Sequence, residues 1–319
     1  MQTIYHRLLK TWCDGMLRRQ VTNMGDRRLD GGLLCPACVL IHGRCADAVP
    51  PMLHQAKLSG DHCYLDAAIA MQAWVENVTK PDGSWMNDVN RGWQGITVFG
   101  AMALCESLVH YGDMLDASVR SRWTERLRLA TKWIYDTIRD VDFSNINYPI
   151  SAGAAMALTG RFLDDKNYLA RAKALTYESL EFISDNGLII GEGQPLREPS
   201  AKGCRPIDVC YNAEESLGAL ALYGLEMGDE AVLQTASSSL RAHLAFMMPD
   251  GGWDASWSTR NFKWTYWGSR TSDGVQTACA LLADRDPLFA QAAYRNAQLY
   301  ERCTHDGLLY GGPDLHHRQ

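Results

Sequence analysis

The feature that most constrains this chain is a pair of helices that recurs along it. Apolar residues follow one another at spacings of three to four positions through most of the sequence, and no segment alternates convincingly with a period of two. The helical pattern is carried by 4–22, Asp61–Val78, Trp93–Tyr111, Ala117–Thr137, Ile150–Phe162, Asn167–Ile183, Ala213–Met227, Glu230–Met247, Ser272–Ala283 and Pro287–Cys303. The sequence therefore predicts an all-α protein.

Short junctions that contain an aspartate separate the two helices of each pair. These aspartates are Asp61, Asp113, Asp165, Asp229 and Asp286. The residue before each is often glycine, which suits the end of one helix, while aspartate suits the start of the next. The aspartates lie 52 to 64 residues apart. We therefore count five helical hairpins with one extra helix at the start.

The loops between pairs also resemble one another, because each holds an Asp-Gly or Asn-Gly turn. They are Pro81–Trp85, Asp185–Leu188, Pro249–Trp253 and Asp306–Leu308. Such hairpins curl into an open solenoid or a closed (α/α) toroid, and the long loops rich in Trp, Gly and Asn favour the toroid. We expect one incomplete (α/α)6 barrel that occupies residues 1–319 as a single domain. Its sixth inner helix would lie beyond Gln319 in a longer parent or be absent.

Composition narrows the range of partners. The 319 residues are 46% hydrophobic, which suits a large core, and the net charge of −6 provides no basic field for nucleic acid. No apolar run approaches the roughly 20 residues of a membrane helix, and the N-terminus lacks the apolar stretch of a signal peptide. We expect neither a nucleic-acid nor a membrane partner, and the oligomeric state stays open.

Ten cysteines are scattered along the chain, and only Cys35 and Cys38 form a close pair. His42 and Cys45 would complete a zinc site on paper. We favour reduced, buried cysteines that act as small hydrophobic residues, and we expect no metal and no cofactor. Reduced cysteines favour the cytoplasm; a periplasmic location would follow if a leader has been removed.

The repeat also predicts which residues meet at one end of the ring. Nineteen positions before each junction aspartate, near the start of each inner helix, stand His42, Gln94, Ile146, Cys210 and Trp267. Their neighbours add aromatic, amide and guanidinium groups: Arg44, Trp93, Asn145, Asn147, Tyr148, Tyr211 and Tyr266. Aromatic rings stack on sugars, and planar donors hold hydroxyl and carboxylate groups. The pattern therefore favours carbohydrate binding.

Each of these residues also has a purely structural explanation. Asn145 and Asn147 could cap the following helix, and His42 could be a buried histidine with satisfied hydrogen bonds. For Trp85, Trp253 and Trp257 we favour packing within their loops over binding. The recurrence of polar and aromatic groups at one end, rather than any single residue, is the functional signal.

The segment Ser144–Gly153 resembles the asparagine-rich stretch of the (α/α) toroid domain of bacterial polysaccharide lyases. These include alginate-lyase and heparinase-like families, and the likeness is greatest to rhamnose–glucuronate lyases. In those enzymes the asparagine is followed by a histidine or aromatic residue before an alanine-rich helix. Here no histidine follows Asn147, so several residues remain candidates for the base.

This resemblance implies cleavage of a uronic-acid-containing polysaccharide by β-elimination, in which a base removes the C5 proton while donors neutralise the carboxylate. For the carboxylate we select Asn145 and Asn147, with Arg270 or Arg44. Tyr211 or Tyr266 is expected as acid and base, followed by Tyr148 and His42. The sugar-binding residues would be Gln94, Trp93, Glu214 and Trp267.

Two alternatives remain open at this point. A glycoside hydrolase on the same fold needs two carboxylates about 5–10 Å apart, and its candidates are Asp88, Glu192, Asp208, Glu214 and Asp273. The second alternative is a non-catalytic carbohydrate-binding toroid, which would need no such pair of carboxylates.

Overall fold

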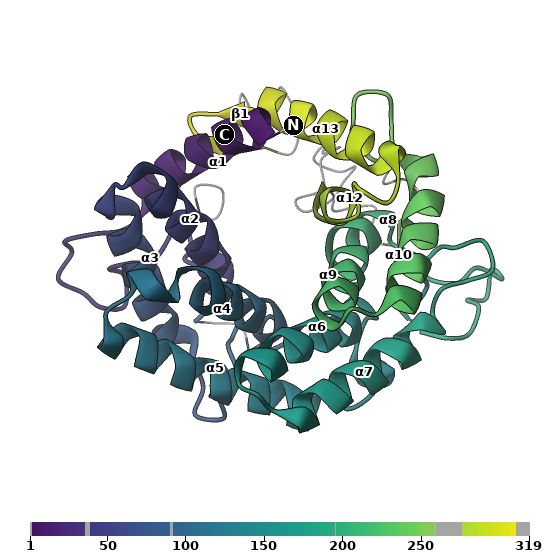
Figure 1. The fold of residues 1–319 in the computed structure, drawn as a ribbon, viewed down its shortest axis with the longest axis horizontal. Helices are drawn as coiled ribbons and strands as arrows, with labels where there is room; N and C mark the ends of the chain where they lie inside the picture. The colour runs from purple at the N-terminus through teal and green to yellow at the C-terminus, as the bar shows by residue number, and fades with distance from the viewer. Residues whose placement is uncertain are drawn as a thin grey trace.

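A computed structural model describes residues 2–35, 39–89, 92–194, 196–254, 256, 258–259 and 276–310. Two concentric layers of helices surround a central opening (Figure 1). The inner layer contains α2 (Val49–Ser59), α4 (Thr97–Tyr111), α6 (Asn147–Phe162), α9 (Leu217–Met227) and α12 (Gln276–Leu281). The outer layer contains α1 (Gln2–Arg19), α3 (His62–Trp74), α5 (Ala117–Thr137), α7 (Lys166–Leu180), α10 (Glu230–His243) and α13 (Pro287–Arg302). The all-α toroid predicted from the sequence is confirmed.

The junction aspartates start the outer helices, with one exception. Asp61, Asp165, Asp229 and Asp286 each accept a backbone N–H from the first turn of the helix that follows. The expectation for Asp113 was wrong. The chain there forms a short 3-10 turn, η3 (Gly112–Met114), and α5 begins only at Ala117. An additional tight turn after α4 therefore moves the start of the outer helix beyond the aspartate.

The Asp-Gly and Asn-Gly turns attach each outer helix to its neighbour. Their glycines Gly83, Gly187, Gly251 and Gly307 all have φ between +74° and +92°, a conformation that glycine adopts without strain. The Gly187 carbonyl accepts from Ser239 Oγ at 2.6 Å, and the Gly251 carbonyl accepts from Asn296 Nδ2 at 2.9 Å. Both donors lie on the next outer helix, so the turns hold successive repeats together.

The tryptophans that end two of these turns pack inside the protein. Trp85 and Trp253 are each 1% exposed, which confirms that they serve loop packing. Gly100 on α4 makes room for Trp85, because a Cβ at this glycine would lie 1.8 Å from the indole ring. Trp257 lies outside the described residues.

The outer wall closes where α1 meets α13 and the short hairpin β1 (Thr304–His305) and β2 (Leu308–Leu309) (Figure 1). Arg7 pairs with Glu301, and Arg18 donates to the Asp306 carbonyl at 2.8 Å. The helix and the hairpin approach so closely that a Cβ on Gly15 would lie 1.9 Å from the Gly307 carbonyl oxygen. α1 therefore takes the place of a sixth outer helix beside the five described hairpins.

Three further short helices and one π-helical turn occur in the loops that bear on the site. They are η1 (Gly43–Ala48), η4 (Val141–Phe143), α8 (Val209–Tyr211) and the π-helical η5 (Asn212–Ser216); η2 (Val75–Val78) and η6 (Leu244–Phe246) end outer helices. Within the described ranges, Cys13, Cys45, Cys63, Cys105, Cys204 and Cys279 are free thiols. None of the helices described is long and apolar enough to cross a membrane.

Candidate active site

The segments at the starts of three inner helices bring three polar side chains together, those of Asn147, Glu215 and Arg44. Asn147 is the first residue of α6 and is only 1% exposed. Its Nδ2 donates to Glu215 Oε2, and Arg44 Nη1 lies 3.8 Å from Glu215 Oε1. The Asn147 Oδ1 has no hydrogen-bond partner among the described residues. An amide and a guanidinium thus converge on one carboxylate, an arrangement suited to holding negative charge.

Arg44 is fixed in place by its surroundings. Its Nε donates to Asp47, and its guanidinium lies 4.3 Å from the ring centre of Phe99. Burial disfavours the charge, but Asp47 and Glu215 outweigh burial and hold the pKa of Arg44 above its usual range. Arg44 therefore remains a permanent cation at the mouth of the ring.

An aromatic group lies beside this cation. Trp93 donates from Nε1 to the Tyr148 hydroxyl at 2.9 Å, and its ring stacks near Phe143 with centroids 6.3 Å apart. Burial raises the pKa of Tyr148. Trp93 keeps 43% of its surface exposed, so its indole offers an apolar platform of the kind on which sugar rings stack.

The π-helical turn η5 directs Glu215 toward Arg44 and Asn147. Asp208 starts the preceding α8 by accepting the Tyr211 N–H at 3.1 Å. A π-helical turn holds more residues than an α-helical one and is frequent at functional sites. It shifts the register so that Glu215 contacts both donors, while the charge of Glu214 helps to raise the pKa of Arg44.

A buried, neutral pair supports this turn from behind. Asn212 Nδ2 donates to the Ile189 carbonyl at 2.8 Å and lies 3.1 Å from His243 Nε2. His243 Nδ1 lies 2.8 Å from the Ser239 carbonyl, so Nδ1 carries the proton and Nε2 accepts. Burial lowers the pKa of His243 to about 4. The pair therefore fixes the residue next to Tyr211 without adding charge.

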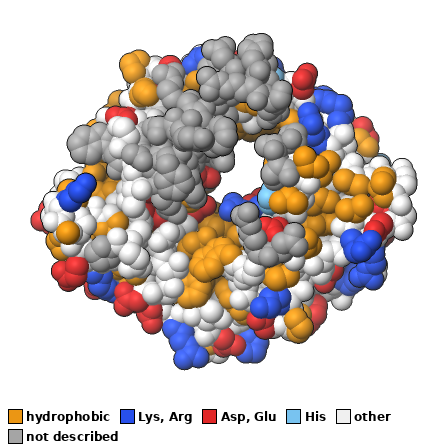
Figure 2. Space-filling view, turned by 180° about the vertical axis from the view of Figure 1, so that it is seen from behind, with side chains coloured by type: hydrophobic (Ala, Val, Ile, Leu, Met, Phe, Trp, Pro, Cys, Tyr) orange, Lys and Arg blue, Asp and Glu red, His pale blue; other side chains and the backbone are white. Residues whose placement is uncertain are grey.

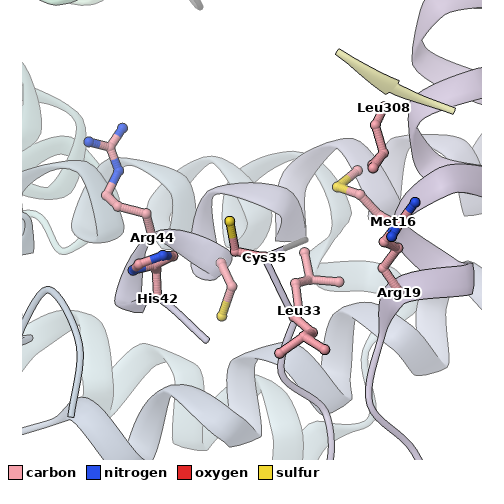
Figure 3. A pocket seen from close by; sticks show the side chains of 9 residues that line it. Met16, Arg19, Leu33, Cys35, His42, Arg44 and Leu308 are labelled. Atoms are coloured by element: carbon pink, nitrogen blue, oxygen red, sulfur yellow. The ribbon is translucent and has the colours of Figure 1, made fainter. Parts of the chain in front are cut away.

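The remaining candidates from the sequence fall into three groups. His42 and Arg44 line one cleft at the mouth of the ring (Figure 3). Tyr211 is partly exposed at the end of α8, and Asn145 is partly buried with its carbonyl accepting the Tyr148 N–H at 3.0 Å. Tyr266, Trp267 and Arg270 lie outside the described residues.

For two of the predicted site residues, Asn147 and Gln94, the geometry shows whether the side chain has a structural role. The side chain of Asn147 does not cap α6, because it donates to Glu215 and the helix has no side-chain cap. Gln94 instead serves the neighbouring turn, since its Nε2 donates to Ser84 Oγ at 2.5 Å. Of the two, Asn147 has the surroundings expected of a functional residue.

The carboxylates considered for a hydrolase are mostly structural. Asp88, Glu192 and Asp208 are at most 2% exposed. Glu192 accepts the Asn147 backbone N–H at 2.9 Å, and Asp208 caps α8. Asp273 lies outside the described residues. Carboxylates held this deeply cannot flank a sugar, which weighs against the hydrolase alternative.

Sequence reasoning missed Glu215, Phe99 and the Asn212–His243 pair. Glu215 adjoins the selected Glu214, but a helical register of 3.6 residues does not indicate which of them faces Arg44. The pairing of Asn212 with His243 joins residues 31 positions apart on different helices. No local pattern in the sequence marks either feature.

Figure 2 shows the ring from behind, with charged side chains close to the central opening and larger patches of hydrophobic side chains to the right of the opening and below it. In the described part of the chain, no three His, Cys, Asp or Glu side chains are placed to hold a metal ion. The site therefore consists of amide, guanidinium, carboxylate and aromatic groups.

Comparison with known proteins places this chain in a family. The family model of the ulvan lyase N-terminal domain matches residues 9–319. The chain belongs to the ulvan lyase N-terminal domain family. It is 46% identical over 310 residues to a broad-specificity ulvan lyase of Formosa agariphila, covering 96% of this chain and 48% of that protein. The chain thus spans about half the length of this curated relative.

Solved structures share the fold of this family member at low sequence identity. A GH76 α-mannanase from Bacteroides thetaiotaomicron has a TM-score of 0.66 at 10% identity, covering 97% of this chain and 87% of its own. A polysaccharide lyase has a TM-score of 0.62 at 15% identity, covering 96% of this chain and 48% of its own. These likenesses establish the toroid alone, since hydrolases and lyases both use it.

Proposed function

We propose that this protein is a polysaccharide lyase that cleaves a uronic-acid-containing polysaccharide by β-elimination. The observation that carries the proposal is the convergence of Asn147 and Arg44 on one carboxylate, in a chain of the ulvan lyase N-terminal domain family. Ulvan, the polysaccharide in the name of the Formosa relative, is the first substrate to test.

Asn147 and Arg44 would neutralise the uronate carboxylate. Arginine has five N–H donors and asparagine two, and the contacts with Asp47 and Glu215 occupy only some of them. Donors therefore remain for a second carboxylate. As the C5 proton leaves, negative charge spreads onto the substrate carboxylate, and preorganised donors stabilise that charge most.

Tyr211 is the preferred acid and base. Deprotonated, it would take the C5 proton; the electron pair then forms the C4–C5 double bond, the bond from C4 to the leaving oxygen breaks, and that oxygen receives a proton. One tyrosine can both accept and return the proton because no net proton is consumed. Tyr148 stands next in order, since its hydroxyl accepts a hydrogen bond from Trp93 at the same mouth. Trp93 would provide the sugar platform.

The test is incubation with ulvan while ultraviolet absorbance and reducing ends are measured together. A lyase produces an absorbing unsaturated uronate with every new reducing end. New reducing ends without absorbance would establish a hydrolase instead, and a raised melting temperature with no product would establish a binding module.

The base can be tested with a matched pair of variants. Tyr211→Phe should abolish turnover with little loss of stability, while Tyr294→Phe, on the exposed outer face of α13, should leave turnover unchanged. Normal turnover in Tyr211→Phe would remove this tyrosine from the mechanism.

A further inference from the structure

A cleft of about 280 Å³ adjoins the candidate active site (Figure 3). It lies between the last turn of α1, the segment before η1, and β2. His42 and Arg44 form one side, and Arg19 lies on the other. Because Arg44 belongs to both the cleft and the site, a chain bound at the site would continue into this cleft.

Every side chain that lines the cleft is either basic or uncharged. Arg19, His42 and Arg44 are among its nine lining residues, and none of the nine is acidic. Arg44 already contacts Asp47 and Glu215. Arg19 is partly buried, and its side chain has no hydrogen bond or ion pair with the residues that the structure describes. The described residues therefore provide Arg19 with no anionic partner.

The two arginines at the end of α1 have different surroundings. Both lie in the last turn, where a cation interacts favourably with the helix dipole, but only Arg18 donates to the Asp306 carbonyl. Arg19 instead lines the cleft. Its guanidinium provides a planar donor set that matches carboxylate and sulfate oxygens.

The remaining walls are apolar and the space is small. Met16, Leu33 and Leu308 are among the apolar side chains that line the cleft. Ligand pockets measure about 300–1,000 Å³, so this cleft suits one sugar residue. The apolar walls would contact the C–H face of the sugar while Arg19 binds its charged substituent.

We propose that this cleft is a subsite for an anionic sugar residue next to the one at which the polysaccharide is cleaved, with Arg19 as its specificity-determining residue. The proposal rests on the proposed lyase function. The ligand chemistry is an oxyanion on a pyranose, either a carboxylate or a sulfate ester.

The test replaces Arg19 with glutamine and uses Arg122→Gln as its control. Arg122 is exposed on the outer helix α5 and is not among the residues that line the cleft. Both variants lose one positive charge, so a general effect of net charge on a polyanion would appear in both. Arg19→Gln should raise KM about tenfold, the loss expected for one charge-assisted hydrogen bond. Its kcat should change less than about threefold, since the contact is made equally before and during the reaction.

Chemical removal of ester sulfate from the same polysaccharide separates the two oxyanions. If the KM difference between wild type and Arg19→Gln disappears on the desulfated polymer, Arg19 binds sulfate; if it persists, Arg19 binds a carboxylate. An unchanged KM in Arg19→Gln on both polymers overturns the subsite.

Binding is measured separately from turnover, so that failure of the subsite and failure of the lyase function remain distinguishable. Calorimetric titration with oligosaccharides of the same polymer should show about tenfold weaker binding to Arg19→Gln than to Arg122→Gln. This comparison holds even if wild type forms no unsaturated product, in which case the lyase function fails and the subsite stands. Equal binding to both variants would remove the subsite whatever the activity.

Discussion

Asn147 and Asn212 lie at the starts of adjacent inner segments, and both are almost fully buried. In the part of the chain that the structure describes, neither Oδ1 has a hydrogen-bond partner. Asn147 donates to the carboxylate of Glu215, which also faces Arg44. Asn212 donates to a carbonyl and to the neutral ring of His243. Two asparagines at nearly the same point of the repeat thus differ in their partners. Asn147 contacts a charged side chain, whereas Asn212 contacts only neutral groups in the described structure.

This difference separates chemistry from support. A donor beside permanent charges can stabilise a charge that develops during a reaction. A donor between neutral, buried partners stabilises the fold, because an unpaired polar group there has a high free-energy cost. We therefore expect Asn147 to control turnover and Asn212 with His243 to control stability.

The largest expected effect is on turnover. Asn147→Ala should lower kcat by about 10²-fold or more, as for the loss of one donor to a developing oxyanion. Unfolding in urea should show a smaller change, about 1 kcal/mol, because one hydrogen bond is lost. The comparison variant is Asn212→Ala, which should lose more stability and less kcat in folded samples. Equal losses of kcat in Asn147→Ala and Asn212→Ala would contradict the assignment of turnover to Asn147 and of stability to Asn212.

The second effect is on stability. His243→Leu should lower the free energy of unfolding by about 2–3 kcal/mol, because it leaves Asn212 Nδ2 and the Ser239 carbonyl with fewer partners in the core. Urea titration measures this loss. The double variant with Asn212→Leu should be less destabilised than the sum of the single variants, since both partners are then apolar. Strict additivity would show that the two side chains do not interact.

The third expected effect is the pH dependence of the stability that His243 contributes. Burial lowers the pKa of His243 from 6.5 to about 4, so between these values the unfolded chain binds the proton and the folded chain does not. Its contribution to stability is complete above pH 6.5 and is lost as pH falls toward 4, by about 3 kcal/mol in all. The difference in unfolding free energy between wild type and His243→Leu, measured from pH 7 to pH 4, should shrink accordingly. A constant difference over that range would contradict a neutral, buried His243.

Much of the ring was predictable because its causes are local. Capping by Asp165 and Asp229 depends on residues two or three positions away, and the positive φ of Gly83 depends on the turn itself. The wrong prediction at Asp113 displaced a helix boundary by only a few residues, because one extra 3-10 turn moved the start of α5 to Ala117. Patterns with a short period therefore determine the elements but not every boundary.

The candidate site was only partly predictable. Counting repeats led to Asn147, Tyr148 and Arg44, because equivalent positions of a closed ring share one end. It did not lead to Glu215, whose direction depends on the π-helical turn, or to Arg19, which reaches the mouth only because α1 closes the ring against α13.

The sequence by itself determined that this protein is a ring of helical hairpins with polar and aromatic groups at the starts of the inner helices. Only the tertiary structure decided which of these groups face one another. The pairs Asn147 with Glu215, Arg44 with Glu215 and Asn212 with His243 join side chains 31 to 171 positions apart. The free energy of a hydrogen bond or ion pair depends on distances of a few ångströms, which packing across the ring determines and no local pattern encodes.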